Sequence, residues 1–193
     1  MKEPKVEIPC APTRRFASRV TACALSLERA AVRCGGFAIG IVASYTRAMF
    51  DALGGRPNAY VSRVKPSAHV AGRAYVSRSG YKFDDVKPYL YVTEDFGATW
   101  KSIASNLPSQ PINVITEDPK NPNLLFVGTE FGLFVSLDAG KTYTPFQNGL
   151  PNVRVDDILI HPRDRDLIVG THARSIWIMD DITPLEQMAA KAG

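Results

Sequence analysis

One motif occurs twice in the chain, in register. "LYVTEDFGATW" occupies residues 90–100, and "LFVSLDAGKTY" occupies residues 133–143, 43 residues further along. An acidic residue, a glycine, a hydroxyl and an aromatic side chain recur at the same offsets. The shared positions are Thr93, Asp95, Gly97, Thr99 and Trp100 in the first copy and Ser136, Asp138, Gly140, Thr142 and Tyr143 in the second. A motif that returns at a fixed period of this size predicts a repeat architecture.

The residues around the motif repeat as well. Asp118-Pro119 returns as His161-Pro162, and the "NLP" at 106–108 returns as "GLP" at 149–151. Each unit contains short β-rich runs separated by turns of Pro, Gly, Asn and Asp, so it predicts four strands. In the clearest unit they are expected at 112–117, 124–128, 133–136 and 142–146. Four antiparallel strands per unit of this length predict a β-propeller blade.

Two further units flank the clearest one. An earlier, stretched unit begins near 61, and its second turn is enlarged around Asp84-Asp85. A final unit runs from Val153, but its motif has decayed: Asp181 keeps the acidic position and Thr183 replaces the glycine. We therefore expect an all-β fold, a partial β-propeller of about three four-stranded antiparallel blades. Closed propellers have at least about four blades, so we do not expect a closed ring.

Composition divides the chain near residue 57. Residues 1–56 contain ten alanines and seven arginines but no Asn, Gln, His or Trp. We predict a helical or disordered N-terminal extension over 1–56, propeller blades over 57–185 and a C-terminal tail over 186–193. Two interpretations of the first segment remain open, a divergent extension and an out-of-frame translation. The second interpretation is based on composition, because translation of a GC-rich gene in a wrong frame gives a sequence rich in Ala, Arg and Cys.

Charge and cysteine content argue against several classes of function. Residues 1–56 carry nine Lys/Arg against four Asp/Glu, whereas residues 57–193 carry fourteen against fifteen. The repeat region therefore lacks a basic footprint for nucleic acid. All three cysteines precede residue 57, at spacings that match no zinc or redox pattern. No apolar run is long enough to span a bilayer, and no convincing signal peptide is present.

We interpret the repeated motif as architecture. In the hairpin between the third and fourth strands, the Asp carboxylate can accept backbone N–H bonds, and glycine supplies a positive φ. The Thr hydroxyl can bond the turn again, and the aromatic ring can pack on the neighbouring hairpin. The alternative is a calcium loop built on Asp95 and Asp138. Such a site needs six to eight oxygen ligands, whereas each motif offers one carboxylate.

These residues carry a family resemblance. "TEDFGATW" and "SLDAGKTY" resemble the Asp-box, or BNR, repeats of sialidases, sortilin-type propellers and bacterial propellers named as glycosyl hydrolases. The stretch from "EDPKNPN" to "DDITPL" is similar to the last blades of the bacterial sortilin-like group, which implies a secreted or periplasmic location. That group has glycine near 173 and 175, where this chain has Ala173 and Ser175, so we expect that turn to be strained or reshaped. The arginine triad and Tyr/Glu pair of sialidases cannot be assigned here.

In an antiparallel meander, successive loops lie at alternate ends of the strands, so the loops of all blades divide between two faces of the propeller. The motif turns and "DPKNPN" are expected on one face, and "TEFG" with the inter-blade loops on the other, where propellers generally bind ligands. That second face offers six candidate binding residues: Glu130, Phe131, Asp156, Asp157, His172 and Arg174. Such a set suits sugar hydroxyls or a peptide carboxylate. The alternative is that the charged members are solvated and His172 is a turn residue.

Three functions remain open. The first is a non-catalytic propeller fragment that acts as a binding or scaffold module. The second is the C-terminal part of a glycoside hydrolase whose paired carboxylates lie on other blades. The third is a truncated gene product without autonomous function. We expect no cofactor, no metal and no catalytic residue. The expected partners are a peptide, protein or carbohydrate, with self-association through open blade edges and no nucleic acid.

Overall fold

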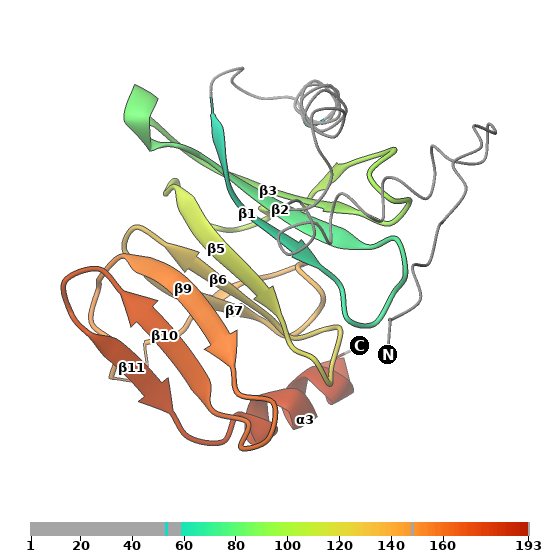
Figure 1. Cartoon of the computed structure of the whole chain (residues 1–193), viewed down its shortest axis with the longest axis vertical. Helices are drawn as coiled ribbons and strands as arrows, with labels where there is room; N and C mark the ends of the chain where they lie inside the picture. The colour runs from blue at the N-terminus through green and yellow to red at the C-terminus, as the bar shows by residue number, and fades with distance from the viewer. Residues whose placement is uncertain (1–52, 54–58, 148, 193) are drawn as a thin grey trace, which may run out of the picture.

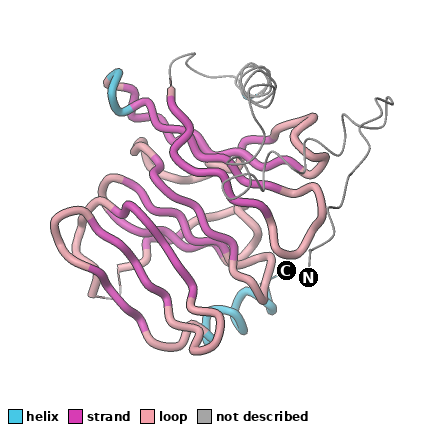
Figure 2. Tube along the Cα trace, in the orientation of Figure 1, coloured by secondary structure: helices cyan, strands magenta, loops and turns pink. Residues whose placement is uncertain are grey.

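The computed structural model describes Leu53, residues 59–147 and residues 149–192. In this part of the chain, eleven strands form three antiparallel sheets of four, four and three strands (Figure 1). Figure 2 shows that strand predominates, with helix at one hairpin tip and near the C-terminus. Apart from Leu53, the extension expected over 1–56 lies outside the described residues. No helix of the described part is long and apolar enough to cross a membrane.

Each sheet is one blade, with its strands in chain order from one edge to the other. Blade 1 contains β1 (Tyr60–Pro66), β2 (Ala74–Gly80), β3 (Asp85–Thr93) and β4 (Lys101–Ser102), with a 3-10 turn η1 (Tyr81–Phe83). Blade 2 contains β5 (Ile112–Glu117), β6 (Leu125–Thr129), β7 (Gly132–Ser136) and β8 (Thr144–Pro145). Blade 3 contains β9 (Val155–Ile160), β10 (Leu167–Thr171) and β11 (Ile176–Met179).

The blades stack through buried aliphatic faces, with β5 lying between β1 and β9 (Figure 1). In blade 2, alternate residues face opposite neighbours, as the period of a strand requires. Ile115 and Val127 belong to the core shared with blade 1, whereas Val114 and Phe126 belong to the core shared with blade 3. Because both faces are covered, all of β5 and β6 is buried.

The innermost strand of each blade contains a β-bulge near its first residues. The pairing register shifts at Ser62 in β1, at Asn113 in β5 and at Asp156 in β9. A bulge adds one residue to a strand and redirects the side chains beside it. The three equivalent bulges therefore present polar residues at the same end of each blade.

The fourth strand expected in the last unit is absent, and this prediction was wrong for blade 3. The chain instead forms α3 (Thr183–Ala192), which begins two residues after Asp181. The expected glycine is Thr183 here, and glycines 97 and 140 of the intact motifs have φ values of 89° and 87°. A β-branched residue resists that backbone conformation. Thr183-Pro184 instead starts a helix, where proline is tolerated in the first turn.

Buried ionic contacts hold α3 beneath blades 2 and 3. Arg165 Nη2 donates to Asp118 Oδ1 over 2.6 Å and also pairs with Glu186 of α3. Asn121 Nδ2 donates to the carbonyl oxygen of Glu186 over 2.9 Å. Ala189 is fully buried in the core between blades 2 and 3. The segment expected as a tail from 186 onward is thus helical and packed as far as the structure describes it.

Candidate functional site

The first Asp box is closed by hydrogen bonds within its own turn. Asp95 Oδ1 accepts from the hydroxyl of Thr93 and from the amide of Thr99, both over 2.8 Å. Asp95 Oδ2 accepts from the Thr99 hydroxyl over 2.6 Å. The Thr93 hydroxyl also accepts from Gly97 N over 2.8 Å. Hydrogen bonds from Thr99 and then from Thr93 lower the pKa of Asp95 to about 2.

The second Asp box repeats these contacts. Asp138 Oδ1 accepts from the Ser136 hydroxyl over 2.8 Å and from Thr142 N over 2.9 Å. Its Oδ2 accepts from the Thr142 hydroxyl over 2.6 Å. Partial burial raises the pKa of Asp138, but the bonds from Thr142 and Ser136 outweigh it, and the pKa is lowered overall. Both carboxylates are thus occupied by their own turns.

The box aromatics lie differently in the two blades. Trp100 is half-buried and donates from Nε1 to the carbonyl of Gly97 over 3.1 Å. Tyr143 is 4% exposed and lies in the core between blades 1 and 2. Among the described residues, no group of three His, Cys, Asp or Glu side chains could hold a metal ion.

Two contacts fix which loops share a face. Ala139 of the second box turn donates from its amide to the carbonyl of Asn123 in the β5–β6 turn over 2.9 Å. Phe96 of the first box turn donates to Gly72 in the β1–β2 turn over 3.0 Å. Box turns therefore lie beside the β1–β2 and β5–β6 turns. The β6–β7 and β10–β11 turns lie at the opposite ends of the strands, together with the bulges.

This bulge face contains a connected cluster of charged side chains. Arg154 Nε donates to Asp156 Oδ1 over 2.6 Å, and its Nη1 lies 3.5 Å from Glu130 Oε1. His172 Nδ1 lies 3.4 Å from Asp156 Oδ2. Partial burial lowers the pKa of Arg154, but the hydrogen bond to Asp156 and the charge of Glu130 outweigh it and raise the pKa overall. Arg154 thus joins blade 2 to blade 3.

Asp157 belongs to a separate ion pair. Arg63 Nη2 of blade 1 donates to Asp157 Oδ1 of blade 3 over 2.7 Å. The pair spans the innermost strands because each residue directly follows a bulge. Between them, Asn113 of β5 is 7% exposed, and its Nδ2 has no hydrogen-bond partner among the described residues. A buried amide of this kind can be satisfied by water or by a polar ligand.

Exposed aromatic rings adjoin this cluster. Phe131 follows Glu130 in the β6–β7 turn and is 62% exposed. Tyr60, at the start of β1, is 37% exposed, and its hydroxyl makes a small contribution to the raised pKa of Arg154. Lys82 Nζ of η1 lies 5.6 Å from the centre of the Tyr60 ring. Arg174 is exposed in the β10–β11 turn.

The predicted set is therefore brought together in part. Glu130, Asp156 and His172 join one cluster, Phe131 borders it, and Asp157 pairs elsewhere. Sequence reasoning missed Arg154, Arg63 and Tyr60. The three bulges share no residue type, so no sequence signal marked the positions that place these side chains.

A Tyr/Glu pair does exist, but in the core. Tyr75 donates from its hydroxyl to Glu117 Oε1 over 2.9 Å, and the two residues are 2% and 3% exposed. Glu117 also accepts from the Ser67 hydroxyl and from Ala68 N, which ties the β1–β2 turn to blade 2. Burial has the largest effect on the pKa of Tyr75 and raises it, and the charge of Glu117 raises it further. The pair is buried between blades, where a substrate has no access.

No protein-family model matches this chain, and no curated protein matches it. Solved structures of GH74 enzymes do. The GH74 enzyme of Niastella koreensis matches with a TM-score of 0.52 and 21% identity, covering 63% of this chain and 21% of that chain. An ancestral GH74 enzyme gives 0.49 and 21%, covering 59% and 14%. The GH74 xyloglucanase of Xanthomonas campestris gives 0.47 and 17%, covering 68% and 21%.

The Niastella comparison establishes the architecture. The described part of this chain is a partial β-propeller that resembles a segment of a GH74 enzyme. The chain spans about a fifth or less of the length of these enzymes. At this identity the likeness concerns the fold.

Proposed function

We propose that this chain is a non-catalytic binding module of the Asp-box, sortilin-like class, and that its bulge face binds carbohydrate. The observation that carries the proposal is the charged cluster of Glu130, Arg154, Asp156 and His172 beside the exposed ring of Phe131. Carboxylates and a guanidinium supply acceptors and donors for sugar hydroxyls. An exposed ring supplies a flat apolar surface for the faces of a sugar.

The geometry favours binding over catalysis. Glycoside hydrolysis needs two carboxyl groups in different roles, one of them a proton donor. Here Glu130 and Asp156 both contact the Arg154 guanidinium. A guanidinium shared by two carboxylates orients them as hydrogen-bond acceptors, which suits recognition.

The test of the proposal is calorimetric titration of the chain with xyloglucan oligosaccharides, the substrate class named for the Xanthomonas enzyme. We expect binding by the wild type and at least a tenfold loss in the Arg154→Gln variant. Phe131→Ala should weaken binding with an unchanged melting temperature, because its ring is exposed.

Arg163→Gln is the matched control. Arg163 also pairs with an aspartate, Asp164, over 2.8 Å, but it lies in the β9–β10 turn at the opposite face. This variant should bind as the wild type does. Absence of binding by the wild type, or equal losses in the two arginine variants, would contradict the proposal. If peptides from a panel bind and the sugars do not, the ligand of this face is a peptide and the carbohydrate proposal is wrong.

The likeness to GH74 enzymes favours a second candidate, a segment of a glycoside hydrolase whose remaining catalytic groups lie on other blades. Incubation with aryl glycosides separates the two. We expect no turnover by this chain. Turnover that disappears in a Glu130→Gln variant would support the hydrolase and make Glu130 catalytic.

A further inference from the structure

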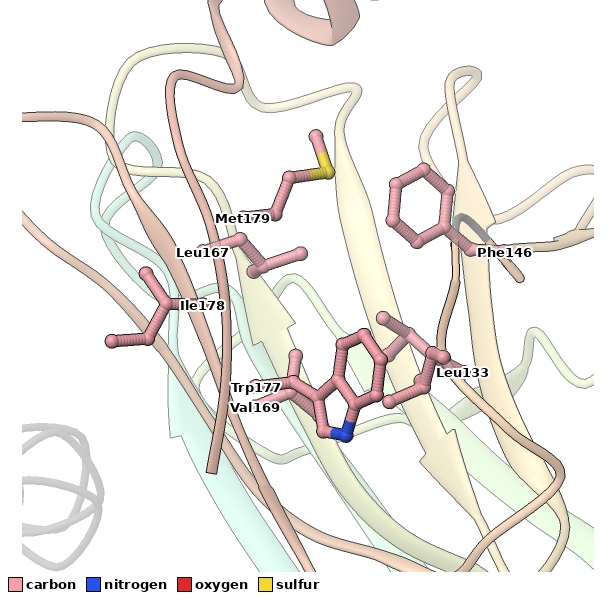
Figure 3. Close-up of a pocket in the computed structure, with 8 residues that line it drawn as sticks. Leu133, Phe146, Leu167, Val169, Trp177, Ile178 and Met179 are labelled. Carbon is pink, nitrogen blue, oxygen red and sulfur yellow. The ribbon is translucent and has the colours of Figure 1, made fainter. Parts of the chain in front are cut away.

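The interface between blades 2 and 3 contains an apolar cavity of about 200 Å³ that is partly open to solvent (Figure 3). Trp177 and Met179 project into it from β11, facing Leu133 and Phe146 of blade 2. The full lining is Leu133, Phe146, Leu150, Leu167, Val169, Trp177, Ile178 and Met179, and the Ile178 side chain is directed away from the others (Figure 3). The cavity is separate from the charged cluster of the bulge face, because none of these residues belongs to that cluster.

The repeat explains the cavity. Six lining residues have counterparts one unit earlier, and all six pack in or against the core between blades 1 and 2. The counterparts are Leu90, Ile103, Leu107, Leu125, Val127 and Phe134. That core also contains the ring of Tyr143, the aromatic residue of the second Asp box. Burial raises the pKa of Tyr143, as expected for a ring enclosed by aliphatic groups.

Blade 3 supplies no such ring. The residue one repeat after Tyr143 is Glu186, which lies on α3 and pairs with Arg165. The third Asp box thus lacks the aromatic residue, whereas six residues of the cavity wall have apolar counterparts in the core around the Tyr143 ring. Between blades 1 and 2, these counterparts enclose a phenol ring.

We infer that this cavity binds a small aromatic molecule with one ring, of phenol size. Apolar cavities of about 150 Å³ in protein cores take up benzene, so the volume is sufficient. The aliphatic and aromatic walls give dispersion contacts on both faces of a ring. The open side allows a hydroxyl to remain hydrated. A ligand of so few atoms binds with a dissociation constant of about 1 mM.

The probe is p-cresol, which reproduces the tyrosine side chain. Binding is measured as a change in Trp177 fluorescence in a Trp100→Phe background, which leaves one tryptophan in the chain. We expect a saturable change and a p-cresol-dependent rise in melting temperature. No saturable change up to ten times the expected dissociation constant would overturn the inference.

Leu150→Phe places a ring at the cavity wall from within the chain. We expect this variant to melt at a higher temperature and to bind p-cresol at least tenfold more weakly. The matched control is Leu107→Phe at the equivalent position between blades 1 and 2, where Tyr143 already lies. That variant should melt at a lower temperature and still bind p-cresol. Where Leu150→Phe fails to fold, Val169→Leu serves instead. Binding unchanged in the folded cavity variant would place the ligand elsewhere and overturn the inference.

A second observation concerns the outward side of blade 3. Leu159, Ile176 and Ile178 are 57%, 67% and 60% exposed, and Ile168 pairs directly with Leu159 and Ile178 across the sheet. We name these four residues the blade-3 face. They form a continuous aliphatic surface on one side of the three strands.

In blade 2, the equivalent positions contact the following blade. They are Thr116, Phe126, Leu133 and Val135. Phe126, Leu133 and Val135 lie in the core shared with blade 3, and the Thr116 hydroxyl donates to Ile158 O over 3.1 Å. The blade-3 face therefore has the composition of a blade interface. At the other end of the stack, Ala74 and Val76 of β2 are fully buried.

We propose that the blade-3 face binds the same face of a second copy of this chain, related by a two-fold axis. Sheet-on-sheet stacking is the packing that the molecule uses at both internal interfaces. Ala74 and Val76 on the outward side of β2 are fully buried, which disfavours head-to-tail stacking on that strand. A two-fold arrangement is self-complementary and closes at two copies. Four side chains form a small interface, so we expect a weak dimer in the micromolar range.

Sedimentation velocity over a hundredfold range of concentration tests this proposal. We expect a reversible monomer–dimer equilibrium, weakened at least tenfold in an Ile178→Glu variant. Val86→Glu, at a strand residue that is 51% exposed in blade 1, should dimerise as the wild type does. A monomer at all concentrations would overturn the proposal, as would growth beyond the dimer. Equal weakening by both variants would also overturn it.

Discussion

Blades 2 and 3 share one core and have their first three strands in the same order, but they end differently after one shared aspartate. In blade 2, Asp138 accepts hydrogen bonds from Ser136 and Thr142, and the chain continues into β8. In blade 3, Asp181 accepts from the amide of Thr183 over 3.0 Å, and the chain continues into α3. The acidic residue is common to both, so it does not determine the outcome.

The residues around the aspartate decide between hairpin and helix. Gly140 adopts a φ of 87°, which a β-branched residue at the equivalent position 183 resists. The hydroxyl donor Ser136 corresponds to Met179, which has no donor to offer a carboxylate. With both features lost, the carboxylate accepts from the amide of Thr183, two residues along the chain, in an Asx-type turn that leads into the helix. The same side chain at the same repeat position thus serves two local structures.

The largest expected effect concerns what holds α3 in place of a fourth strand. Arg165→Met should lower the free energy of unfolding by about 3–5 kcal/mol, because it leaves buried carboxylates of Asp118 and Glu186 without their cation. Urea unfolding measures the change. Arg163→Met, whose side chain is 83% exposed, should change stability by less than about 0.5 kcal/mol. Similar results for the two variants would show that the ionic contacts do not fix α3.

The second prediction compares the two aspartates directly. Asp138→Ala removes the acceptor of three hydrogen bonds in a partly exposed turn, so we expect a loss of about 1–2 kcal/mol. Thr142→Val removes one of these bonds and should cost less. Asp181→Ala should also cost less, since its carboxylate accepts from Thr183 alone. Denaturant midpoints of the three variants give the order, and a larger loss for Asp181→Ala would reverse the comparison.

Much of the blade architecture could be predicted from the sequence. The strand expected at 112–117 coincides with β5, and the one expected at 124–128 differs from β6 by one residue at each end. Turn residues and alternating apolar residues act locally, so a sequence displays them. The Asp-box hydrogen bonds were predictable for the same reason, because all of them join residues within four positions of each other.

The site was less predictable because its contacts are not local. Arg154 meets Glu130 only when two blades stack, and Arg63 meets Asp157 across a third strand. Bulges at Ser62 and Asp156 aim the neighbouring side chains, yet these positions share no residue type. The helix after Asp181 was missed for a different reason. Thr183 stands where the Asp box has glycine, which indicates a decayed repeat, but a hydroxyl followed by proline at 183–184 also indicates a helix start.

The third prediction concerns the β10–β11 turn, where blade 3 again departs from a glycine pattern. Ala173 and Ser175 have φ values of 65° and 66°, which supports the expected strain in this turn. Ala173→Gly should raise the free energy of unfolding by about 0.5–1 kcal/mol, because glycine adopts this conformation without steric cost. Ala190→Gly, at an exposed position of α3, should lower it by a similar amount. Destabilisation by both substitutions would show that the turn is not strained.

The smallest expected effect is the acid response of the Asp boxes. Hydrogen bonds from Thr99 hold the pKa of Asp95 at about 2 in the folded chain, against an ordinary value of 3.8. Between pH 2 and pH 4 the Asp95 carboxyl binds more protons in the unfolded chain than in the folded chain. Its contribution to the free energy of unfolding is therefore present above about pH 4 and is lost as the pH falls towards 2. Asp95→Asn should flatten this part of the profile, and Thr99→Val, which removes one donor, should flatten it less. Urea midpoints between pH 2 and 6 measure both slopes. An Asp95→Asn profile parallel to that of the wild type would show that the box turn does not hold its carboxylate in the ionised form.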